Sequence, residues 1–332
     1  MLDSSVFDKA VELIGRARSI LVTTHTKPDG DACGSAAALA EALEGRGKKV
    51  EVLMLSEVPA WYEFLFDKKP VVFERDINAE QLSSKTDADL IILVDVNSEN
   101  QLQGFGEWLR ANRKKVLVFD HHVTSDGLGD AEVVDVEASS AGLVVFEFLK
   151  YAGWAISGKM AEALFLAIAT DTGWFRFANV DGRTHRACAE LLDMGVDSAG
   201  LYKQLYQNFS AERFALMNLM LGRLVLHFEG RYACQEIYWA DFAKTGASPV
   251  DTENLIDECQ RIKTVEAAAL FTELSDGRIK CSMRSRGAVD VREIAAKFGG
   301  GGHVMAAGTY VPGPMDNAKK LIYAEMEGQI RG

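Results

Sequence analysis

Apolar and polar positions along the first half of the chain follow the order strand, helix, strand. Residues 19–24 are an apolar, β-branched run, residues 33–43 are rich in alanine and leucine, and residues 49–55 again favour a strand. Two further apolar runs, 90–94 and 116–119, repeat the strand pattern. Strands that read as buried apolar runs and are joined by helices are typical of a parallel sheet. The first half therefore predicts an α/β domain with a parallel sheet.

The pattern changes in the last third of the chain, where hairpins replace the strand–helix alternation. Residues 223–228 and 232–238 form one predicted hairpin, and residues 267–274 and 278–283 form another. The 332 residues also exceed the usual size of one domain. We expect the active site in a cleft between two domains. The predicted parts are an N-terminal catalytic domain over 1–195, a helical linker over 196–221 and a smaller α/β domain with a mixed sheet over 222–332.

Polar clusters follow the ends of four apolar runs. They are His25-Thr-Lys-Pro-Asp29-Gly-Asp31, Asp95-Val-Asn97, Asp120-His121-His122 and Asp171-Thr-Gly173. Ligands in open parallel sheets bind beyond the carboxyl ends of the strands, so these clusters are expected to converge. An aspartate at a strand end can instead be a helix N-cap, and adjacent histidines also arise by chance. Each of these explanations accounts for one cluster at a time, whereas one shared site accounts for all four clusters together.

The residue types in these clusters indicate two divalent metal ions. Carboxylates suit Mn²⁺ and Mg²⁺, and added imidazole shifts the preference toward Mn²⁺ or another transition ion such as Co²⁺. Asp95 is the candidate bridge between two ions about 3.5–4 Å apart, which would clamp a phosphoryl group during in-line attack. Gly30 is expected to let a loop turn sharply, so that Asp29 and Asp31 face different ions. Phosphoester hydrolysis without a side-chain nucleophile is the leading interpretation.

Composition narrows the class of protein further. The formal net charge of −12 disfavours binding to long duplex nucleic acid, so short anionic substrates fit better. The chain has no apolar run long enough to span a bilayer and no signal peptide, which predicts a cytoplasmic protein without membrane contact. The five cysteines form no C-x-x-C pair and are expected to be reduced.

These motifs resemble those of the DHH-family phosphoesterases that carry a DHHA1 C-terminal domain. The family is named for the triplet found here as Asp120-His121-His122, and the C-terminal run Gly299-Gly-Gly-Gly302-His303 is also similar. Within the family the chain most resembles the bacterial nanoRNase/pAp phosphatases. The resemblance implies hydrolysis of very short single-stranded RNA, including dinucleotides, to 5′-mononucleotides. It also implies hydrolysis of 3′-phosphoadenosine 5′-phosphate (pAp) to AMP.

The resemblance also implies roles for the clustered residues, position by position. Asp120 would orient an imidazole, and His122 would contact the scissile phosphate or protonate the leaving oxygen. Asp95 would bind both ions. One ion would be held by His25, Asp29 and Asp95, and the other by Asp31, Asp95, His121 and Asp171.

A second set of residues is expected to bind the substrate. The resemblance places Arg284 and the Gly-Gly-His segment on the terminal phosphate or base, whereas a glycine run alone is more simply a flexible loop. Trp174, Phe175 and Phe177 offer a stacking surface, with core packing as the alternative. The candidate substrate-binding residues are Arg176, Arg284, Arg286, Gly301, Gly302 and His303.

Rival functions remain open at this point. One is hydrolysis of cyclic-di-AMP or of linear dinucleotides such as pApA and pGpG. Family II inorganic pyrophosphatases share the metal motifs, but the Gly-Gly-Gly-His segment argues against them. A rival of another class is a non-catalytic nucleotide- or RNA-binding protein, against which the intact acidic motifs speak. A homodimer is one assembly that the sequence allows.

Overall fold

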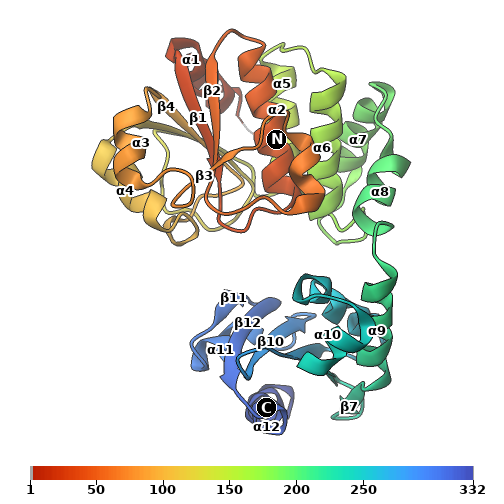
Figure 1. Cartoon of the computed structure of the whole chain (residues 1–332). Coiled ribbons are helices and arrows are strands. Elements are labelled where there is room, and N and C mark those ends of the chain that lie inside the picture. Colours follow the sequence, from red (N-terminus) through yellow and green to blue (C-terminus); the bar gives the residue numbers. More distant parts are fainter. Residues whose placement is uncertain (1–2, 332) are drawn as a thin grey trace. The chain divides into compact units, whose positions relative to one another are not determined.

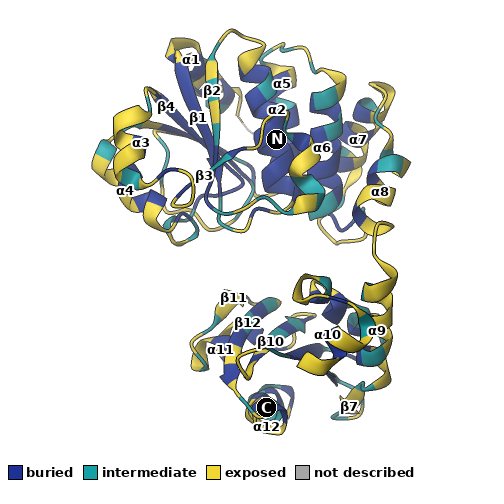
Figure 2. Ribbon diagram, viewed as in Figure 1, coloured by how far each residue is buried: buried dark blue, intermediate teal, exposed yellow. Residues whose placement is uncertain are grey.

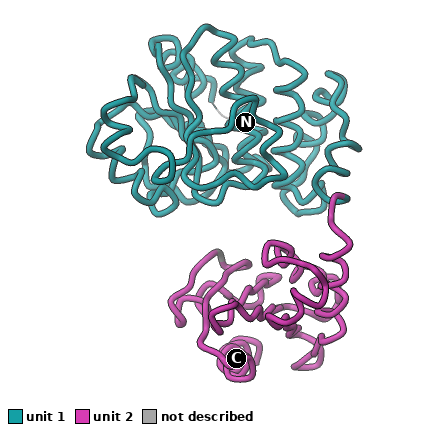
Figure 3. The backbone as a smooth tube through the Cα atoms, in the orientation of Figure 1, with its two compact units in different colours: residues 1–207 teal, residues 208–332 magenta. Residues whose placement is uncertain are grey.

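The computed structural model describes residues 3–331, except for the side chain of His303, and divides into two compact units (Figures 1 and 3). The first unit spans residues 1–207 and the second spans residues 208–332. The predicted linker 196–221 contains two helices, α8 (Ser198–Tyr206) and α9 (Ala211–Gly222), and the boundary falls between them. Apolar side chains of α8 belong to the core of the first unit and those of α9 to a core of the second.

The first unit is built on a six-stranded sheet in which all neighbouring strands are parallel, as the sequence predicts. The strand order is β3-β2-β1-β4-β5-β6, so the direction of winding reverses between β1 and β4. Ligands bind at such a reversal, beyond the carboxyl ends of the strands. The strands are β1 (Ser19–Thr24), β2 (Lys49–Met54), β3 (Val71–Val72), β4 (Leu90–Val94), β5 (Lys115–Asp120) and β6 (Ala131–Val134).

Helices cover both faces of this sheet, because its central strands are apolar on both sides. Ile20 and Val22 of β1 join a core that includes α2, α5 and α6, whereas Leu21 joins a core that includes α3 and α4. Figure 2 shows these strands as buried. The helices of the first unit, besides α8, are α1 (Ser4–Arg16), α2 (Gly30–Glu44), η1 (Ala60–Leu65), α3 (Ala79–Lys85), η2 (Glu99–Gln101), α4 (Gly104–Asn112), α5 (Ala141–Tyr151), α6 (Gly158–Asp171) and α7 (Gly182–Asp193).

Close packing of α6 against α2 and α5 depends on glycine. A Cβ on Gly34 would lie 2.4 Å from the carbonyl oxygen of Ala163, and a Cβ on Gly142 would lie 2.5 Å from the Cβ of Ala167. Both approaches are shorter than any normal contact, so the helices touch through bare backbone. This packing brings the first turn of α2 next to the start of α5 and the end of α6.

The second unit contains a mixed six-stranded sheet of order β11-β12-β10-β9-β8-β7, in which β8 and β9 are parallel and the other pairs antiparallel. This confirms the predicted mixed sheet. Its strands are β7 (Val225–His227), β8 (Tyr232–Ile237), β9 (Ala267–Glu273), β10 (Arg278–Ser285), β11 (Gly301–His303) and β12 (Ala306–Pro312). Its helices, besides α9, are α10 (Trp239–Thr245), η3 (Pro249–Thr252), η4 (Leu255–Arg261), α11 (Val291–Lys297) and α12 (Met315–Arg331). No helix within residues 3–331 is long and apolar enough to cross a membrane.

Candidate metal centre

The predicted metal ligands lie together at the carboxyl ends of β1, β4 and β5. Three groups of three side chains could each hold a metal ion. Within each group, the potential ligand atoms lie within 4.8 Å of one another. The groups share members, because Asp95 and His121 each belong to two of them. They therefore form one centre. The groups are Asp95 with His121 and His122, His25 with Asp29 and Asp95, and Asp31 with His121 and Asp171.

The segment after β1 differs from the loop that the sequence led us to expect. Asp29 is the N-cap of α2, where its Oδ1 accepts a hydrogen bond from Ala32 N at 3.1 Å, and Asp31 lies in the first helical turn. Gly30 is helical and makes no sharp turn. Its Cα instead packs on α6, where a Cβ would lie 2.4 Å from Thr170 Oγ1. The expected role of Gly30 was wrong because helix packing, not loop geometry, requires the glycine.

Asp31 is held by the N-terminus of α5. Its Oδ2 accepts a hydrogen bond from Ala141 N at 2.6 Å, and its Oδ1 accepts one from Gly142 N at 2.8 Å. Ser35 Oγ also donates to Oδ1 at 3.2 Å. The helix dipole adds positive potential at this end of α5. Nothing in the sequence around residue 141 indicated this supporting role.

Asp95 occupies the middle of the centre with an unusual backbone. Its φ of 57° is in the left-handed region, which costs a non-glycine residue free energy and is most often retained at functional sites. Asp95 Oδ2 lies 3.4 Å from His25 Nε2, and Oδ1 lies 3.6 Å from His121 Nε2. Oδ1 is buried and has no hydrogen-bond partner among residues 3–331. A buried carboxylate oxygen without a partner is costly unless a cation binds it.

The two candidate ligand histidines, His25 and His121, lie within hydrogen-bonding distance of backbone carbonyls. Nδ1 of His25 lies 2.9 Å from the carbonyl oxygen of Thr26, and Nδ1 of His121 lies 3.2 Å from that of Ala138. If each Nδ1–H donates to its carbonyl, each Nε2 keeps a lone pair directed into the centre, as a metal ligand requires. Nε2 of His121 is 3.6 Å from Asp171 Oδ2, which α6 places there.

The remaining histidine of the triplet has a different partner. Nδ1 of His122 lies 2.8 Å from Oδ1 of the buried Asp120 and 3.7 Å from Asp95 Oδ1. Asp120 therefore orients His122 rather than His121. The hydrogen bond to Asp120 raises the pKa of His122, whereas burial and the neighbouring His122 lower the pKa of His121.

Carboxylates in the centre repel one another. Burial raises the pKa of Asp31 and Asp95 well above the ordinary value, and nearby carboxylates raise it further. Burial, followed by the charge of Asp29, raises the pKa of Asp171 to about 7. Divalent cations would remove this repulsion and satisfy Asp95 Oδ1. The donor set, the orphaned oxygen and the crowded negative charge all fit bound metal ions.

A hydrogen-bond network that the sequence did not predict links the loops after β4 and β5. Asn97 is 1% exposed, and its Nδ2 donates to Ser125 Oγ at 2.8 Å and to Glu132 Oε2 at 3.2 Å. The carbonyl of Asn97 accepts from Asp126 N at 2.9 Å. Only the position of Asn97 within the Asp95 cluster could have suggested this role.

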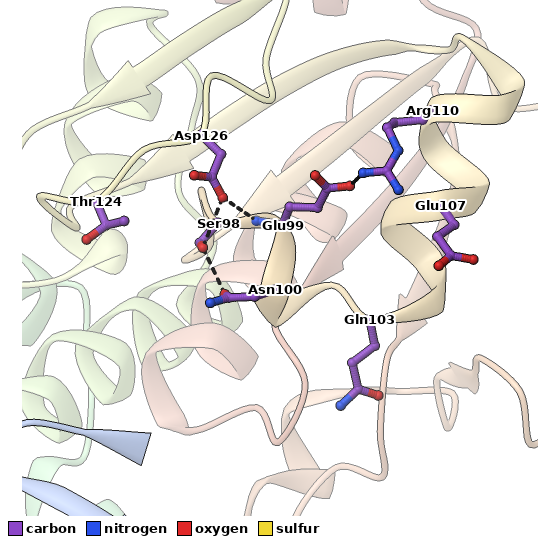
Figure 4. A pocket seen from close by; sticks show the side chains of 8 residues that line it. All are labelled: Ser98, Glu99, Asn100, Gln103, Glu107, Arg110, Thr124 and Asp126. Atoms are coloured by element: carbon purple, nitrogen blue, oxygen red, sulfur yellow. Dashed lines mark hydrogen bonds and ion pairs between the residues drawn. The ribbon is translucent and has the colours of Figure 1, made fainter. Parts of the chain in front are cut away.

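An open polar depression lies beside these two loops, and Figure 4 shows the side chains that line it. None of the predicted metal ligands belongs to its lining. Its carboxylates would repel a phosphate. The positive charge of Arg110 is already paired with Glu99. The lining residues are Ser98, Glu99, Asn100, Gln103, Glu107, Arg110, Thr124 and Asp126.

The predicted substrate residues of the second unit lie on β10 and β11, which β12 separates, and Arg286 directly follows β10. Arg284 of β10 pairs with Ala306 of β12, which pairs in turn with His303 of β11. The side chain of His303 is outside the described part of the structure. Arg284 Nε donates to Asp257 Oδ1 at 3.0 Å, and Arg286 Nη1 donates to the carbonyl of Lys263 at 3.2 Å.

Strand packing explains part of the glycine run. A Cβ on Gly300 would lie 2.2 Å from the carbonyl oxygen of Gly308, and one on Gly302 would lie 2.4 Å from that of Ala306. Gly302 also has a φ of 141°, whereas a Cβ on Gly301 would meet no atom within 4 Å. Gly301 therefore has an open backbone, and the sheet itself requires glycine at the other two positions.

Comparison with known proteins agrees with this geometry. The model of the DHH family, N-terminal domain, matches residues 19–168, and the model of the DHHA1 domain matches residues 229–331. A Thermus thermophilus protein named bifunctional oligoribonuclease and PAP phosphatase NrnA is 30% identical over 94% of this chain and 90% of its own. The chain belongs to the DHH family. The DHH triplet of this family member is Asp120-His121-His122, and its second unit is a DHHA1 domain.

Two further comparisons place this DHH protein among its relatives. The crystal structure of an exopolyphosphatase-related protein from Bacteroides fragilis is 26% identical, with a TM-score of 0.91 and coverage of 98% of this chain and 96% of that one. A cyclic-di-AMP phosphodiesterase, GdpP of Geobacillus thermodenitrificans, is 26% identical over 89% of this chain but only 45% of its own length. The DHH protein thus matches the Thermus and Bacteroides proteins over 90% and 96% of their lengths, and GdpP over 45% of its length.

Proposed function

We propose that this chain is a metal-dependent phosphohydrolase that cleaves very short oligoribonucleotides to 5′-mononucleotides and pAp to AMP. It belongs to a family of phosphoesterases, and the Thermus relative that it matches over 90% of that protein's length is named for these two activities. The observation that carries the proposal is the sharing of Asp95 and His121 between the three ligand groups. That sharing joins separate clusters into a single centre, as two-metal attack on one phosphate group requires.

Six side chains are the candidate ligands for metal ions in this centre. We propose that His25, Asp29 and Asp95 hold one ion, and that Asp31, Asp95, His121 and Asp171 hold the other. When bound, two divalent ions supply Lewis-acid stabilisation of the phosphoryl oxygens and an activated water molecule. The mixture of carboxylate and imidazole favours Mn²⁺, with Mg²⁺ or Co²⁺ as substitutes.

Protonation of the leaving oxygen is the step that the chain's own residues perform. Asp120 keeps His122 oriented and favours its protonated form. As the oxygen of water bonds to phosphorus, the bond to the leaving nucleoside oxygen breaks, and a proton from His122 goes to that oxygen. The proton that water loses goes to solvent, which leaves a 5′-monophosphate as product.

Recognition of the substrate end is assigned to the second unit. Arg284 and Arg286 are forked donors suited to a terminal phosphate, and Gly301 leaves open space beside its backbone, on the same strand as His303. We propose that these residues bind the end of the substrate that is not cleaved. The net charge of −12 disfavours a long duplex, which suits a substrate of a few nucleotides.

The experiment is a turnover panel with purified protein and Mn²⁺. A labelled RNA dinucleotide should yield 5′-mononucleotides, and pAp should yield AMP and phosphate. Cyclic-di-AMP, its linear product pApA and pyrophosphate are tested beside them. Failure to hydrolyse both the RNA dinucleotide and pAp, under conditions in which the protein binds Mn²⁺, would overturn the proposal.

Hydrolysis of cyclic-di-AMP is the second candidate. The partial match to GdpP favours it, although the chain spans less than half of that protein. Turnover of the cyclic dinucleotide well above that of the RNA dinucleotide and pAp would select this activity. A non-catalytic binding role is less compatible with the raised pKa values of Asp31 and Asp95, because burying those carboxylates without a cation is costly.

A further inference from the structure

The segment after the metal-centre residue Asp171 contains a left-handed turn. Gly173, Trp174 and Phe175 have φ values of 55°, 60° and 63° in succession. Left-handed backbone is disfavoured for L-residues, and consecutive non-glycine residues in this region are rare. Such a conformation persists where the surrounding structure holds it, and it is most often found at binding or catalytic sites.

Tertiary contacts hold the turn in place. The ring of Trp174 packs against those of Tyr202 and Tyr206 on α8, with centroid distances of 5.1 and 5.5 Å. Phe175 N donates to Thr172 Oγ1 at 3.1 Å, and Phe175 stacks on His185 with centroids 5.5 Å apart. Trp174 and Phe175 therefore anchor the turn, as the core-packing alternative for these aromatics requires.

Unlike Trp174 and Phe175, Phe177 leaves much of its ring exposed to solvent. Its ring folds back onto Gly173, where a Cβ would lie 2.4 Å from the ring atom Cζ. Gly173 must therefore be glycine both for its backbone and to leave room for the ring. Despite this packing, Phe177 is 54% exposed, which is high for a large aromatic side chain. The result is a supported but open ring close in sequence to Asp171.

Arg176 lies beside this ring. Its Nε donates to the carbonyl of Gly173 at 2.6 Å, and its guanidinium carbon lies 5.9 Å from the centroid of Phe177. None of the ion pairs formed by residues 3–331 includes Arg176, although acidic side chains are concentrated in the nearby centre. Its two Nη groups remain available for a phosphate.

We propose that Phe177 stacks on a nucleobase of the substrate and that Arg176 binds the phosphate attached to the same nucleotide. An exposed ring with an adjacent unpaired guanidinium matches one nucleotide, which presents an aromatic face and an anionic oxygen together. The pair adds a base contact within the first unit, next to Asp171. This inference rests on the proposed function, because it assumes a nucleotide substrate.

The test compares Phe177→Ala with wild-type full-length protein loaded with Mn²⁺. For an RNA dinucleotide, KM should rise about 5- to 150-fold, the range expected for loss of one stacked base. Phe177→Trp should retain wild-type KM because it keeps an aromatic face. A dinucleotide that lacks both bases should show the same KM with wild type and Phe177→Ala. Phe214→Ala is the matched control, because Phe214 of α9 has the same 54% exposure. It should leave the KM of both dinucleotides unchanged.

Arg176→Ala separates the phosphate contact from stacking. This variant should weaken binding of the normal and of the base-free dinucleotide equally, because both carry the phosphate. The inference is wrong if Phe177→Ala leaves the KM of the dinucleotide unchanged or impairs the base-free analogue to the same extent. Calorimetric binding of the dinucleotide in Ca²⁺ needs no turnover, so it tests stacking even if wild-type protein fails to hydrolyse RNA. That failure would count against the proposed function alone.

Discussion

Oδ1 of Asp120 lies 2.8 Å from Nδ1 of His122, and Asp120 is completely buried at the end of β5. A buried carboxylate stabilises the imidazolium form, which is why the pKa of His122 is raised. The second residue of the triplet, His121, is directed by a backbone carbonyl instead. The two histidines of one triplet therefore differ, because the pKa of His121 is lowered and that of His122 is raised.

Substitution of Asp120 should shift the pH dependence of hydrolysis. Proton donation requires the imidazolium form, so activity is lost as pH rises through the pKa of His122. Asp120→Asn removes the charge that raises this pKa, and the alkaline limb of the kcat/KM profile should move to lower pH. His122→Ala should reduce kcat about 10²- to 10⁴-fold, the range for loss of a general acid. Steady-state profiles of both variants and wild type measure these effects.

A p-nitrophenyl ester provides the control for that prediction. Its leaving group needs little protonation, so the His122 variant should lose less activity on this ester than on RNA. An alkaline limb that stays at the wild-type pH in Asp120→Asn would show that this hydrogen bond does not govern proton transfer.

Asp95→Asn should abolish hydrolysis while leaving the fold intact. Asparagine tolerates the left-handed φ of 57° at this position, so the substitution removes the charge and little else. Because Asp95 is shared between ligand groups, Mn²⁺ binding should weaken at both positions. Calorimetric titration of Mn²⁺ and circular dichroism measure the two outcomes. Glu107→Gln, a carboxylate of the depression in Figure 4, is the control and should retain activity. Unchanged turnover in Asp95→Asn would remove Asp95 from its bridging role.

The metal-free protein should become less stable as pH rises from about 4 to about 7. Asp171 has a folded-state pKa of about 7, above its ordinary value. In this window the folded state binds more protons than the unfolded state, so stability falls with increasing pH. Asp171→Asn should weaken the dependence without abolishing it, since the pKa values of Asp31 and Asp95 are raised as well. Saturating Mn²⁺ should reverse the dependence, because metal binding competes with protons. Thermal melts across this pH range, with and without Mn²⁺, measure the effect. A metal-free melting temperature that rises over this range would contradict the pKa assignment.

Gly34→Ala should destabilise the first unit by about 1–3 kcal/mol, the usual cost of overpacking. The new Cβ would lie 2.4 Å from the carbonyl oxygen of Ala163, so α2 and α6 would have to separate. Gly15→Ala in α1 is the matched control, since its Cβ would meet no atom within 4 Å. That control should be neutral or stabilise by about 0.5–1 kcal/mol. Urea denaturation of both variants makes the comparison, and equal effects would show that close helix packing is not the cause.

Much of the fold was accessible from the sequence because apolar runs in a doubly wound sheet are long and buried. The strands at residues 19–24 and 90–94 have the predicted bounds. The break at residues 207–210, which divides the predicted linker into α8 and α9, was not predicted. Both helices carry apolar side chains, and only the core that each one joins distinguishes them.

The sequence alone determined which side chains can form the centre, because His25, Asp95 and the DHH triplet directly follow strands whose carboxyl ends meet at one edge of a parallel sheet. Tertiary structure decided how they are held. The N–H groups of Ala141 and Gly142 reach Asp31 across more than 100 residues, and Gly30 and Gly34 are needed for the packing of α2 on α6. Local sequence records the order of residues and their periodicity, whereas a hydrogen bond or a close approach between distant segments depends on how the helices pack.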